Sequence, residues 1–301
     1  MNSAACMAEA VEQKSAAALE SRRLMSLDAL RGFDMFWILG ADSFVYALHN
    51  LTPSAPTTFL ASQLEHSEWQ GIRFYDLIFP LFVFIMGVST VFSLTKIIAR
   101  EGRAVAVKRI LRRGILLFII GLIYSGGFTE PWPDMRLMGV LNRIALCYTF
   151  GGLLFVFLRP RALIAVAVAL LLGYWAMLNF IPIRDIHLQK DHLAARAAKA
   201  GDAKLAAEFL NVNGWTDNPS AIKDSPLWAA TKKMYFAETN YVTGKFEMGY
   251  NVANHFDFEY LPARKYDVFW DPEGLLSTIP AIVTGLLGIF AGLLLQNKSV
   301  P

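Results

Sequence analysis

The sequence predicts an all-α, multi-pass transmembrane helical bundle with about six membrane helices, and three observations lead to this fold class. Of the 301 residues, 55% are hydrophobic, and the mean hydropathy is +0.39. Only 18% of the residues are charged, whereas soluble globular proteins carry about 25%. The third observation is a set of long apolar runs, which approach the roughly 20 residues that cross about 30 Å of hydrocarbon. These runs are Phe33–Leu51, Leu77–Leu94, Gly114–Phe128, Leu137–Leu158, Ala162–Ile183 and Leu275–Gln296.

The apolar runs do not alternate between apolar and polar residues as a half-buried strand does, so we interpret them as helices. The third run is short and must include Ile110 and Leu111 to span a bilayer. The first 24 residues are polar and Ala-rich and lack the apolar core of a signal peptide. The chain therefore divides into a cytoplasmic N-terminal segment (1–24), a five-helix membrane region (25–183), an extracytoplasmic loop region (184–274), and a sixth helix with the end of the chain (275–301).

The loop region has two parts of different composition. Asp191–Leu210 is rich in Ala with interspersed charges and predicts a soluble helix. Trp215–Trp270 is rich in aromatic, Asn and Asp residues without a helical period. Such a composition suits either binding to sugar faces or a lid that packs on the membrane surface.

Lys and Arg residues gather at one side of the predicted bundle. Because basic residues in short loops mark the cytoplasmic side, we expect the N-terminus inside and loops 52–74, 129–136 and 184–274 outside. This orientation fits a bacterial inner membrane. The basic residues are Arg22, Arg23, Lys96, Arg100, Arg103, Lys108, Arg109, Arg112, Arg113, Arg159, Arg161 and Lys298.

Several kinds of site are not indicated. The two cysteines, Cys6 and Cys147, form neither a disulfide framework nor a metal-ligand pattern. His187, His192 and His255 lack ligand-like spacing, so no metal is expected. The net charge of +3 is modest, and no basic run beside aromatic residues indicates nucleic acid.

The first membrane run carries an unusual number of ionisable residues. On a continuous α-helix, Arg31 and Asp42 differ by about 20° in direction, and Asp28 and His49 fall near the same line. Intramembrane ionisable groups usually pair or face a cavity. A structural ion pair between Asp28 and Arg31 is the simpler alternative, whereas Asp42 needs a partner outside its own helix. His66 is one candidate for that partner.

His66 lies just before the second apolar run, at the outer mouth of the bundle. An imidazole titrates near neutral pH, so His66 is a candidate proton acceptor or acyl carrier; a solvated loop histidine is the alternative. Arg73 and Asp76 follow on one face of the next helix. Asn142 and Arg143 lie one turn inside another helix, where Arg143 either acts at a site or snorkels to the interface.

Four segments together resemble the heparan-α-glucosaminide N-acetyltransferase family and its bacterial relatives linked to N-acetylglucosamine use. The segments are Arg23–Gly32 with its continuation (RLMSLDALRGFDMFWILGAD), His66–Gly87 (HSEWQGIRFYDLIFPLFVFIMG), Arg136–Arg143 (RLMGVLNR) and Asp271–Thr278 (DPEGLLST). The resemblance covers roughly residues 22–180 and 268–297. It implies a multi-pass enzyme that moves acetyl from cytosolic acetyl-CoA, as co-substrate, to a glucosamine-type amino sugar across the membrane.

The resemblance also implies roles for individual residues. His66 stands at the catalytic histidine of the family, and Asp42 stands where lysosomal members have a functional Asn. Arg31 and Arg143 are expected to meet acidic groups of coenzyme A. Substrate or structural support is assigned to Asp28, Asp76, Asn142, Asp271 and Glu273.

Two rival functions remain open from the sequence. A transporter of amino sugars or another small polar solute would also place charges within its helices, and a structural or sensory membrane fragment would need no chemistry. Besides lipid and the amino sugar, a homodimer is a candidate assembly. Family members continue with further helices, so the chain is expected to be a fragment of a larger bundle, with reduced or no activity by itself.

Overall fold

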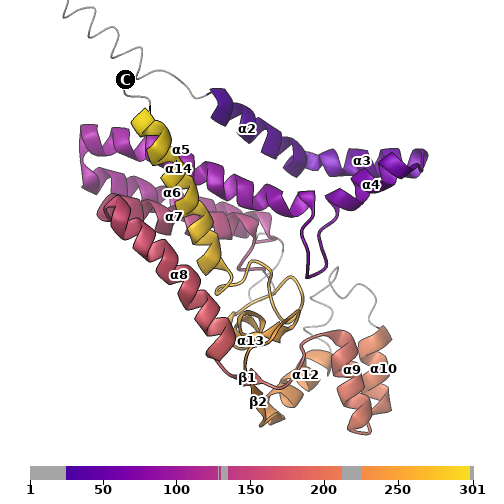
Figure 1. The fold of residues 1–301 in the computed structure, drawn as a ribbon. Helices are drawn as coiled ribbons and strands as arrows, with labels where there is room; N and C mark the ends of the chain where they lie inside the picture. Colours follow the sequence, from indigo (N-terminus) through magenta and orange to yellow (C-terminus); the bar gives the residue numbers. More distant parts are fainter. Residues whose placement is uncertain (1–24, 128, 130–134, 212–225, 299–301) are drawn as a thin grey trace, which may run out of the picture. The chain divides into compact units, whose positions relative to one another are not determined.

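The computed structural model describes residues 25–127, 129, 135–211 and 226–298 (Figure 1). The predicted N-terminal segment 1–24, including Cys6, therefore lies outside the described residues, as does part of the predicted loop 129–136. The chain forms two compact units, Met1–Glu65 and His66–Pro301.

In the first unit, the predicted membrane run 33–51 is not one helix. Helix α2 (Met25–Phe36) is followed by a π-helical turn, η1 (Trp37–Ala41), and then by α3 (Asp42–Leu51). Gly40 lies within this turn at φ 118°, a conformation that glycine adopts without the penalty of a side chain. The prediction that Arg31 and Asp42 share one helical line is thus wrong, because a constant 100° per residue holds only along an uninterrupted α-helix.

The predicted outer loop after this run contains a further helix, α4 (Ala55–Leu64). The hydroxyl of Ser54 caps its N-terminus by accepting the backbone N–H of Thr57, and the Thr57 hydroxyl accepts the backbone N–H of Ser54. This reciprocal capping satisfies two N–H groups that a helix start would otherwise leave unpaired.

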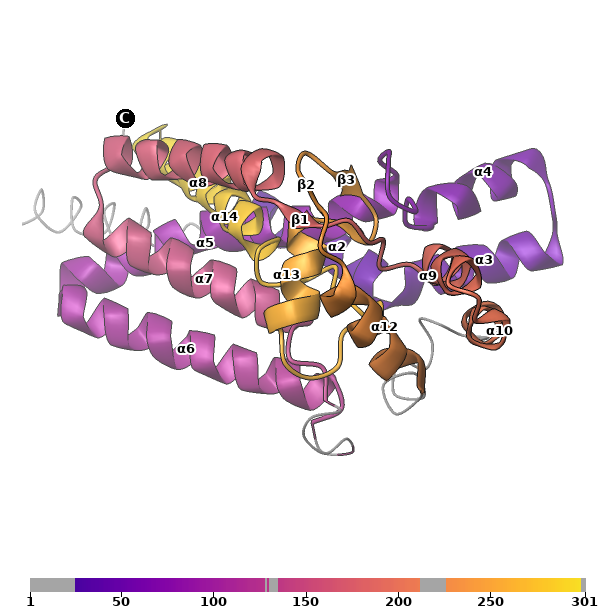
Figure 2. The ribbon, with the colours of Figure 1, turned by 90° about the horizontal axis from the view of Figure 1, so that it is seen from below.

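The second unit contains five long helices. They are α5 (Ile78–Glu101), preceded by a 3₁₀ turn η2 (Phe74–Leu77), α6 (Arg103–Tyr124), α7 (Val140–Phe157), α8 (Pro160–Phe180) and α14 (Thr278–Lys298). Helix α14 packs against α5, α7 and α8, and α6 lies beside α7 (Figures 1 and 2).

Four helices among the described residues are long and apolar enough to cross a membrane. They comprise Phe74–Glu101, Val140–Phe157, Pro160–Phe180 and Thr278–Gln296. Six were predicted. Helix α6 is not among the four because basic residues occupy its first half, and the first predicted span is broken at Gly40. A predominantly all-α membrane bundle is confirmed.

Glycines bring α5 and α14 into backbone contact. A Cβ atom placed on Gly87 would lie 2.1 Å from the carbonyl oxygen of Gly285, and one on Gly288 would lie 2.0 Å from that of Phe84. Neither position therefore tolerates a side chain. Small residues at such crossings let two membrane helices approach closely.

The region between α8 and α14, which the sequence predicts to lie outside and which we call the outer region, is more regular than predicted. The expected single helix Asp191–Leu210 is instead a hairpin of two helices, α9 (Lys190–Lys199) and α10 (Ala203–Asn211). The chain turns between them at Gly201, where φ is 86°. The segment expected to lack helices contains α12 (Pro226–Ala237) and α13 (Val252–Tyr260). Tertiary burial of aromatic faces thus overrode a weak local pattern. Residues 212–225, the start of that segment, lie outside the described part.

Two short antiparallel strand pairs complete this region. Strand β1 (Ile183–Arg184) pairs with β2 (Tyr241–Val242), and β3 (Phe246–Glu247) pairs with β4 (Tyr250–Asn251).

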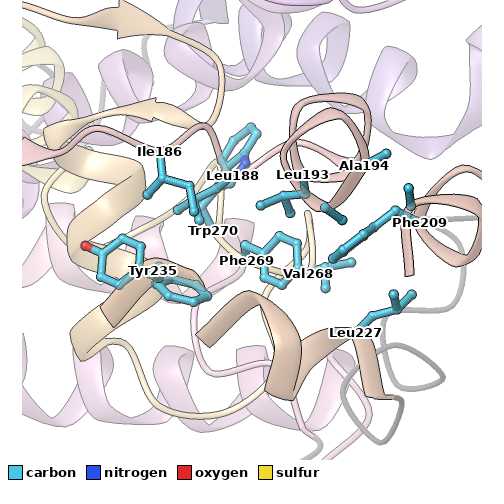
Figure 3. Packing of buried hydrophobic residues seen from close by; sticks show 13 residues of the cluster. Ile186, Leu188, Leu193, Ala194, Phe209, Leu227, Tyr235, Val268, Phe269 and Trp270 are labelled. Atoms are coloured by element: carbon cyan, nitrogen blue, oxygen red, sulfur yellow. The ribbon is translucent and has the colours of Figure 1, made fainter. Parts of the chain in front are cut away.

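The outer region has its own hydrophobic core, which holds the short elements together (Figure 3). The core joins α9, α10, α12, α13 and the segment before α14, so the segment is anchored where it enters the membrane bundle. Its buried residues are Ile186, Leu188, Leu193, Ala194, Ala197, Ala206, Phe209, Leu227, Tyr235, Phe258, Val268, Phe269 and Trp270.

Candidate active site

His66 forms a hydrogen-bonded dyad with Asp76 at the start of the second unit. The imidazole Nδ1 lies 2.8 Å from Asp76 Oδ1. The His66 side chain is 70% exposed, whereas that of Asp76 is 22% exposed. An ionised carboxylate only accepts hydrogen bonds, so Nδ1 carries the proton and Nε2 of the neutral ring keeps its lone pair. Such a ring can accept a proton from a molecule that reaches it.

The local sequence fixes Asp76 in place. Its Oδ2 accepts the backbone N–H of Arg73 at 2.9 Å and the hydroxyl of Ser67 at 2.9 Å. The first of these bonds caps the 3₁₀ turn that leads into α5. The backbone N–H of Ser67 also donates to Oδ2 at 3.4 Å, so with His66 Nδ1 four donors converge on the carboxylate and hold it beside the imidazole. Tyr75 adds a ring contact, with its centroid 5.0 Å from that of His66.

Trp69 connects the His66 loop to the outer region. Its indole N–H donates to the carbonyl oxygen of Phe246 at 2.7 Å. Its ring meets that of Trp270 edge-on, with centroids 5.7 Å apart. The His66 loop therefore lies beside the segment that leads to Asp271.

Arg136 and Asp271 join two segments that are far apart in the sequence. The guanidinium donates from Nε to Asp271 Oδ2 at 2.8 Å and from Nη2 to Asp271 Oδ1 at 2.6 Å. Nη2 also reaches Glu273 Oε2 at 2.5 Å. Burial and the cation shift the pKa of Glu273 in opposite directions, and the pKa is raised overall because burial beside Asp271 dominates.

Arg143 extends this cluster to the start of α7. Its Nη2 donates to the carbonyl oxygen of Pro272 at 3.0 Å and to the hydroxyl of Ser277. Its guanidinium lies 5.9 Å from the ring centroid of Phe79, on the first turn of α5. The buried Nε of Arg143 has no hydrogen-bond partner among the residues that the structure describes. Arg143 thus connects the N-terminal ends of α5 and α7 with the segment before α14.

Asp257 is a buried carboxylate that the sequence reasoning missed. It accepts the backbone N–H of Leu275 at 3.2 Å and that of Asp271 at 3.4 Å. Burial raises the pKa of Asp257 to about 7, against the opposing effect of these hydrogen bonds. A Cβ on Gly274 would lie 1.8 Å from Asp257 Oδ2, so glycine is required there. No local pattern around Asp257 distinguishes it from the other acids of its aromatic segment.

Two other predicted site residues have structural contacts. Asn142 is fully buried and donates to the carbonyl oxygen of Phe118, which links α7 to α6. Arg31 pairs with Asp28 at 3.3 Å, one turn away on α2, as the simpler alternative proposed.

Asp42 is half-buried at the start of α3. It lies in the first unit and His66 in the second, so their predicted partnership stays a prediction. Within the described residues, no group of three or more His, Cys, Asp or Glu side chains is arranged to hold a metal ion.

Comparison with known proteins places most of the membrane region in one family. The family described as "Heparan-alpha-glucosaminide N-acetyltransferase, catalytic" matches residues 23–193. A mouse protein named heparan-alpha-glucosaminide N-acetyltransferase is 38% identical over 103 residues, which are 32% of this chain and 16% of that protein. The human protein of the same name is 38% identical over 90 residues, which are 28% of this chain and 13% of that protein. The matched segments thus cover a small share of either relative.

Proposed function

Because the chain belongs to the heparan-alpha-glucosaminide N-acetyltransferase family, we propose that it transfers an acetyl group to the amine of a glucosamine-type sugar in a membrane. Acetyl-CoA is the proposed donor. The observation that carries this proposal is the His66–Asp76 dyad, because it leaves an oriented imidazole nitrogen at the surface of the second unit.

The proposed chemistry begins with a proton. A sugar ammonium has no lone pair, so Nε2 of His66 first removes one of its protons. The neutral amine then attacks the acetyl carbonyl carbon, and its nitrogen becomes cationic. As the C–S bond breaks, this nitrogen loses its second proton, which the departing thiolate takes up, and the imidazolium of His66 returns the first proton to solvent. Asp76 is a positioning residue in this scheme, since it fixes the tautomer of His66 and stabilises the imidazolium that forms.

A covalent route uses the same nitrogen differently. Here Nε2 of His66 attacks the thioester carbonyl, the thiolate leaves, and the acetyl-imidazole then passes its acetyl group to the amine. Asp76 supports this route equally well. The two routes differ in one observable. Only the covalent route gives an acetylated His66 before the sugar is added.

The Arg136, Asp271 and Arg143 cluster supports the proposal as a scaffold. It joins the outer ends of three helices close to the loop that carries His66. Arg143 contacts the segment before α14, which also meets the loop that carries His66 through Trp270 and Trp69. We therefore assign Arg143 to the acceptor side, in addition to the predicted contact with coenzyme A.

The proposed orientation places His66 outside and the α5–α6 turn inside. Exposed positions Glu68 and Glu101 lie at opposite ends of α5. In a chain whose native cysteines are replaced by serine, a membrane-impermeant thiol reagent should label Glu68→Cys but not Glu101→Cys from outside. The reverse pattern would contradict the orientation.

Acetyl transfer is tested in proteoliposomes that contain this chain. Labelled acetyl-CoA is supplied on the Glu101 side and glucosamine on the His66 side. We expect labelled N-acetylglucosamine, and a loss of about 10²–10⁴-fold in rate for His66→Ala. Labelled His66 in acid-quenched protein without sugar would select the covalent route.

The matched control is His192→Ala, which removes another exposed imidazole from the outer region. It should retain the full rate. Equal losses in both variants would contradict a specific role for His66, and glucosamine uptake without acetylation would indicate a transporter instead.

A further inference from the structure

A cavity of about 310 Å³ lies in the outer region, between α12, the end of α13 and the segment that follows α13. We name it the Lys232 pocket; the residues that matter for its chemistry are Trp228, Lys232, Glu259, Tyr260, Arg264 and Lys265. Its size is at the lower end for small-molecule sites, which suits a ligand about as large as a monosaccharide. It lies beyond residues 23–193, which match the family.

Three cationic side chains line the Lys232 pocket against one carboxylate. The ammonium groups of Lys232 and Lys265 lie 5.3 Å and 5.4 Å from the ring centroid of Trp228. Lys265 is only 4% exposed. Both ammonium groups thus lie near one indole ring in the lining of the pocket, where they favour an anion over a cation.

The remaining charged groups add to the excess of positive over negative charge in the pocket. The Glu259 carboxylate accepts a hydrogen bond from the Tyr235 hydroxyl at 3.4 Å, so part of its charge is already engaged. The backbone N–H of Arg264 donates to the carbonyl oxygen of Met135 at 3.3 Å, which fixes this residue's main chain beside the pocket. The planar guanidinium of an arginine is suited to bidentate contact with an oxyanion.

The segment that forms one wall of the pocket has a strained backbone. Ala263 and Val268 adopt φ values of 70° and 64°. Left-handed conformations are unfavourable for residues with a Cβ, and especially for β-branched valine. Residues held in such conformations cluster at active sites and ligand clamps. Arg264 and Lys265 lie in the chain between these two residues and line the pocket with them.

The geometry points to the Lys232 pocket as a binding site for a sugar-sized oxyanion, a sugar that bears a phosphate, sulfate or carboxylate group. The cations hold the anionic group, and Tyr260 and Trp228 border the space for the ring. A neutral sugar lacks the group that the charges require. This inference is independent of acetyl transfer, since it uses none of the residues assigned to that chemistry.

Binding is measured by titration calorimetry on the full chain in neutral detergent micelles at low salt. The probes are glucose 6-phosphate, glucose 6-sulfate, glucuronate and unmodified glucose. We expect at least one anionic probe to bind below about 10 mM and glucose not to bind. Binding should weaken as salt is added, because the contacts are electrostatic.

Two variants locate the site. Lys232→Gln and Arg264→Gln should each weaken binding of the anionic probe about tenfold, the effect of losing one charge-assisted contact. The matched control is Lys233→Gln, which alters the exposed neighbour of Lys232 on α12 outside the pocket. It should leave binding unchanged.

Three results would overturn the assignment. They are equal binding of glucose and its anionic forms, equal losses in the Lys232→Gln and Lys233→Gln variants, and no binding of any anionic probe. The chain could instead bind vesicles of anionic lipid in a way that glucose 6-phosphate does not reduce. That result would assign the cations to a membrane surface.

Discussion

The guanidinium of Arg136 and the carboxylate of Asp271 form a two-point ion pair across 135 residues of sequence. The Arg136 side chain is 15% exposed and that of Asp271 is fully buried. This pair fastens the segment before α14 to the segment before α7. Since the segment before α14 contacts Trp69 of the loop that carries His66 through Trp270, the pair supports the candidate site.

We expect Asp271→Ala to lower the free energy of unfolding by about 3 kcal/mol, because it removes the two-point ion pair and leaves the buried Arg136 guanidinium with its contact to Glu273. The measurement is denaturant unfolding of the full chain in micelles. Asp28→Ala is the matched control, because it breaks an exposed pair with Arg31, for which about 0–1 kcal/mol is expected. Similar losses in the two variants would contradict a structural role for the Arg136–Asp271 pair.

The buried Asp257 predicts a specific dependence of stability on pH. Its folded-state pKa of about 7 lies above the ordinary value of 3.8 because the side chain is buried. Between these values the folded state binds the proton more tightly than the unfolded state. The contribution of Asp257 is thus present below pH 3.8 and is lost as the pH rises through about 7.

The Asp257→Asn variant separates this effect from other titrations. We expect its unfolding free energy to fall less than that of the natural chain between pH 4 and pH 7, by a few kcal/mol. Unfolding curves at several pH values provide the measurement. Burial also lowers the pKa of His255 to about 4, which acts in the opposite direction, so the comparison must be made between variants. If the unfolding free energies of the variant and the natural chain changed in parallel with pH, the raised pKa of Asp257 would be contradicted.

Glycine packing between α5 and α14 predicts that one added methyl group at this contact lowers the stability of the chain strongly. Gly288→Ala would place a Cβ 2.0 Å from the carbonyl oxygen of Phe84, a backbone atom that cannot turn away. We expect a loss of about 3 kcal/mol or more in unfolding free energy. Gly173→Ala on α8 has open space around its added methyl and should be neutral or slightly stabilising. Equal thermal stability of the two variants would show that α5 and α14 separate easily.

The membrane helices were predictable because their signal is long and needs no partner. Runs such as 140–157 and 160–180 are apolar over most of their length, so length and composition suffice. The break at Gly40 was not predictable, since a glycine inside an apolar run is equally compatible with a continuous helix. Helices α12 and α13 were missed because their burial against residues such as Trp270 depends on contacts that are distant in sequence.

The site was predicted in parts rather than as an arrangement. His66, Asp76, Arg143, Asp271 and Glu273 were each identified, but the bond between His66 and Asp76 was not. Asp42 was the predicted partner of His66, because helical spacing reveals which residues share one face of a single helix. Helical spacing does not reveal a loop that folds back over ten residues and places an imidazole on a helix-capping carboxylate.

The relative importance of Asp42 and Asp76 is therefore the sharpest remaining question about the proposed chemistry. If Asp76 alone orients the imidazole, Asp76→Asn should lower kcat by about 10²–10⁴-fold with little change in KM, because the wrong tautomer is favoured. Asp42→Asn should then keep most of the rate. It also restores the residue that the family resemblance places at this position, so it preserves a polar contact while removing the charge.

The measurement is kcat and KM for acetylation by each variant in proteoliposomes, together with the pH profile of kcat. Loss of Asp76 should shift the low-pH limb of that profile, where the rate rises with pH, because the carboxylate stabilises the imidazolium that forms in the reaction. A large loss for Asp42→Asn with an unshifted profile for Asp76→Asn would make Asp42 the electrostatic partner of His66. Equal losses in both variants, each with a shifted profile, would mean that two carboxylates share the imidazole, with the second supplied by the first unit of the chain.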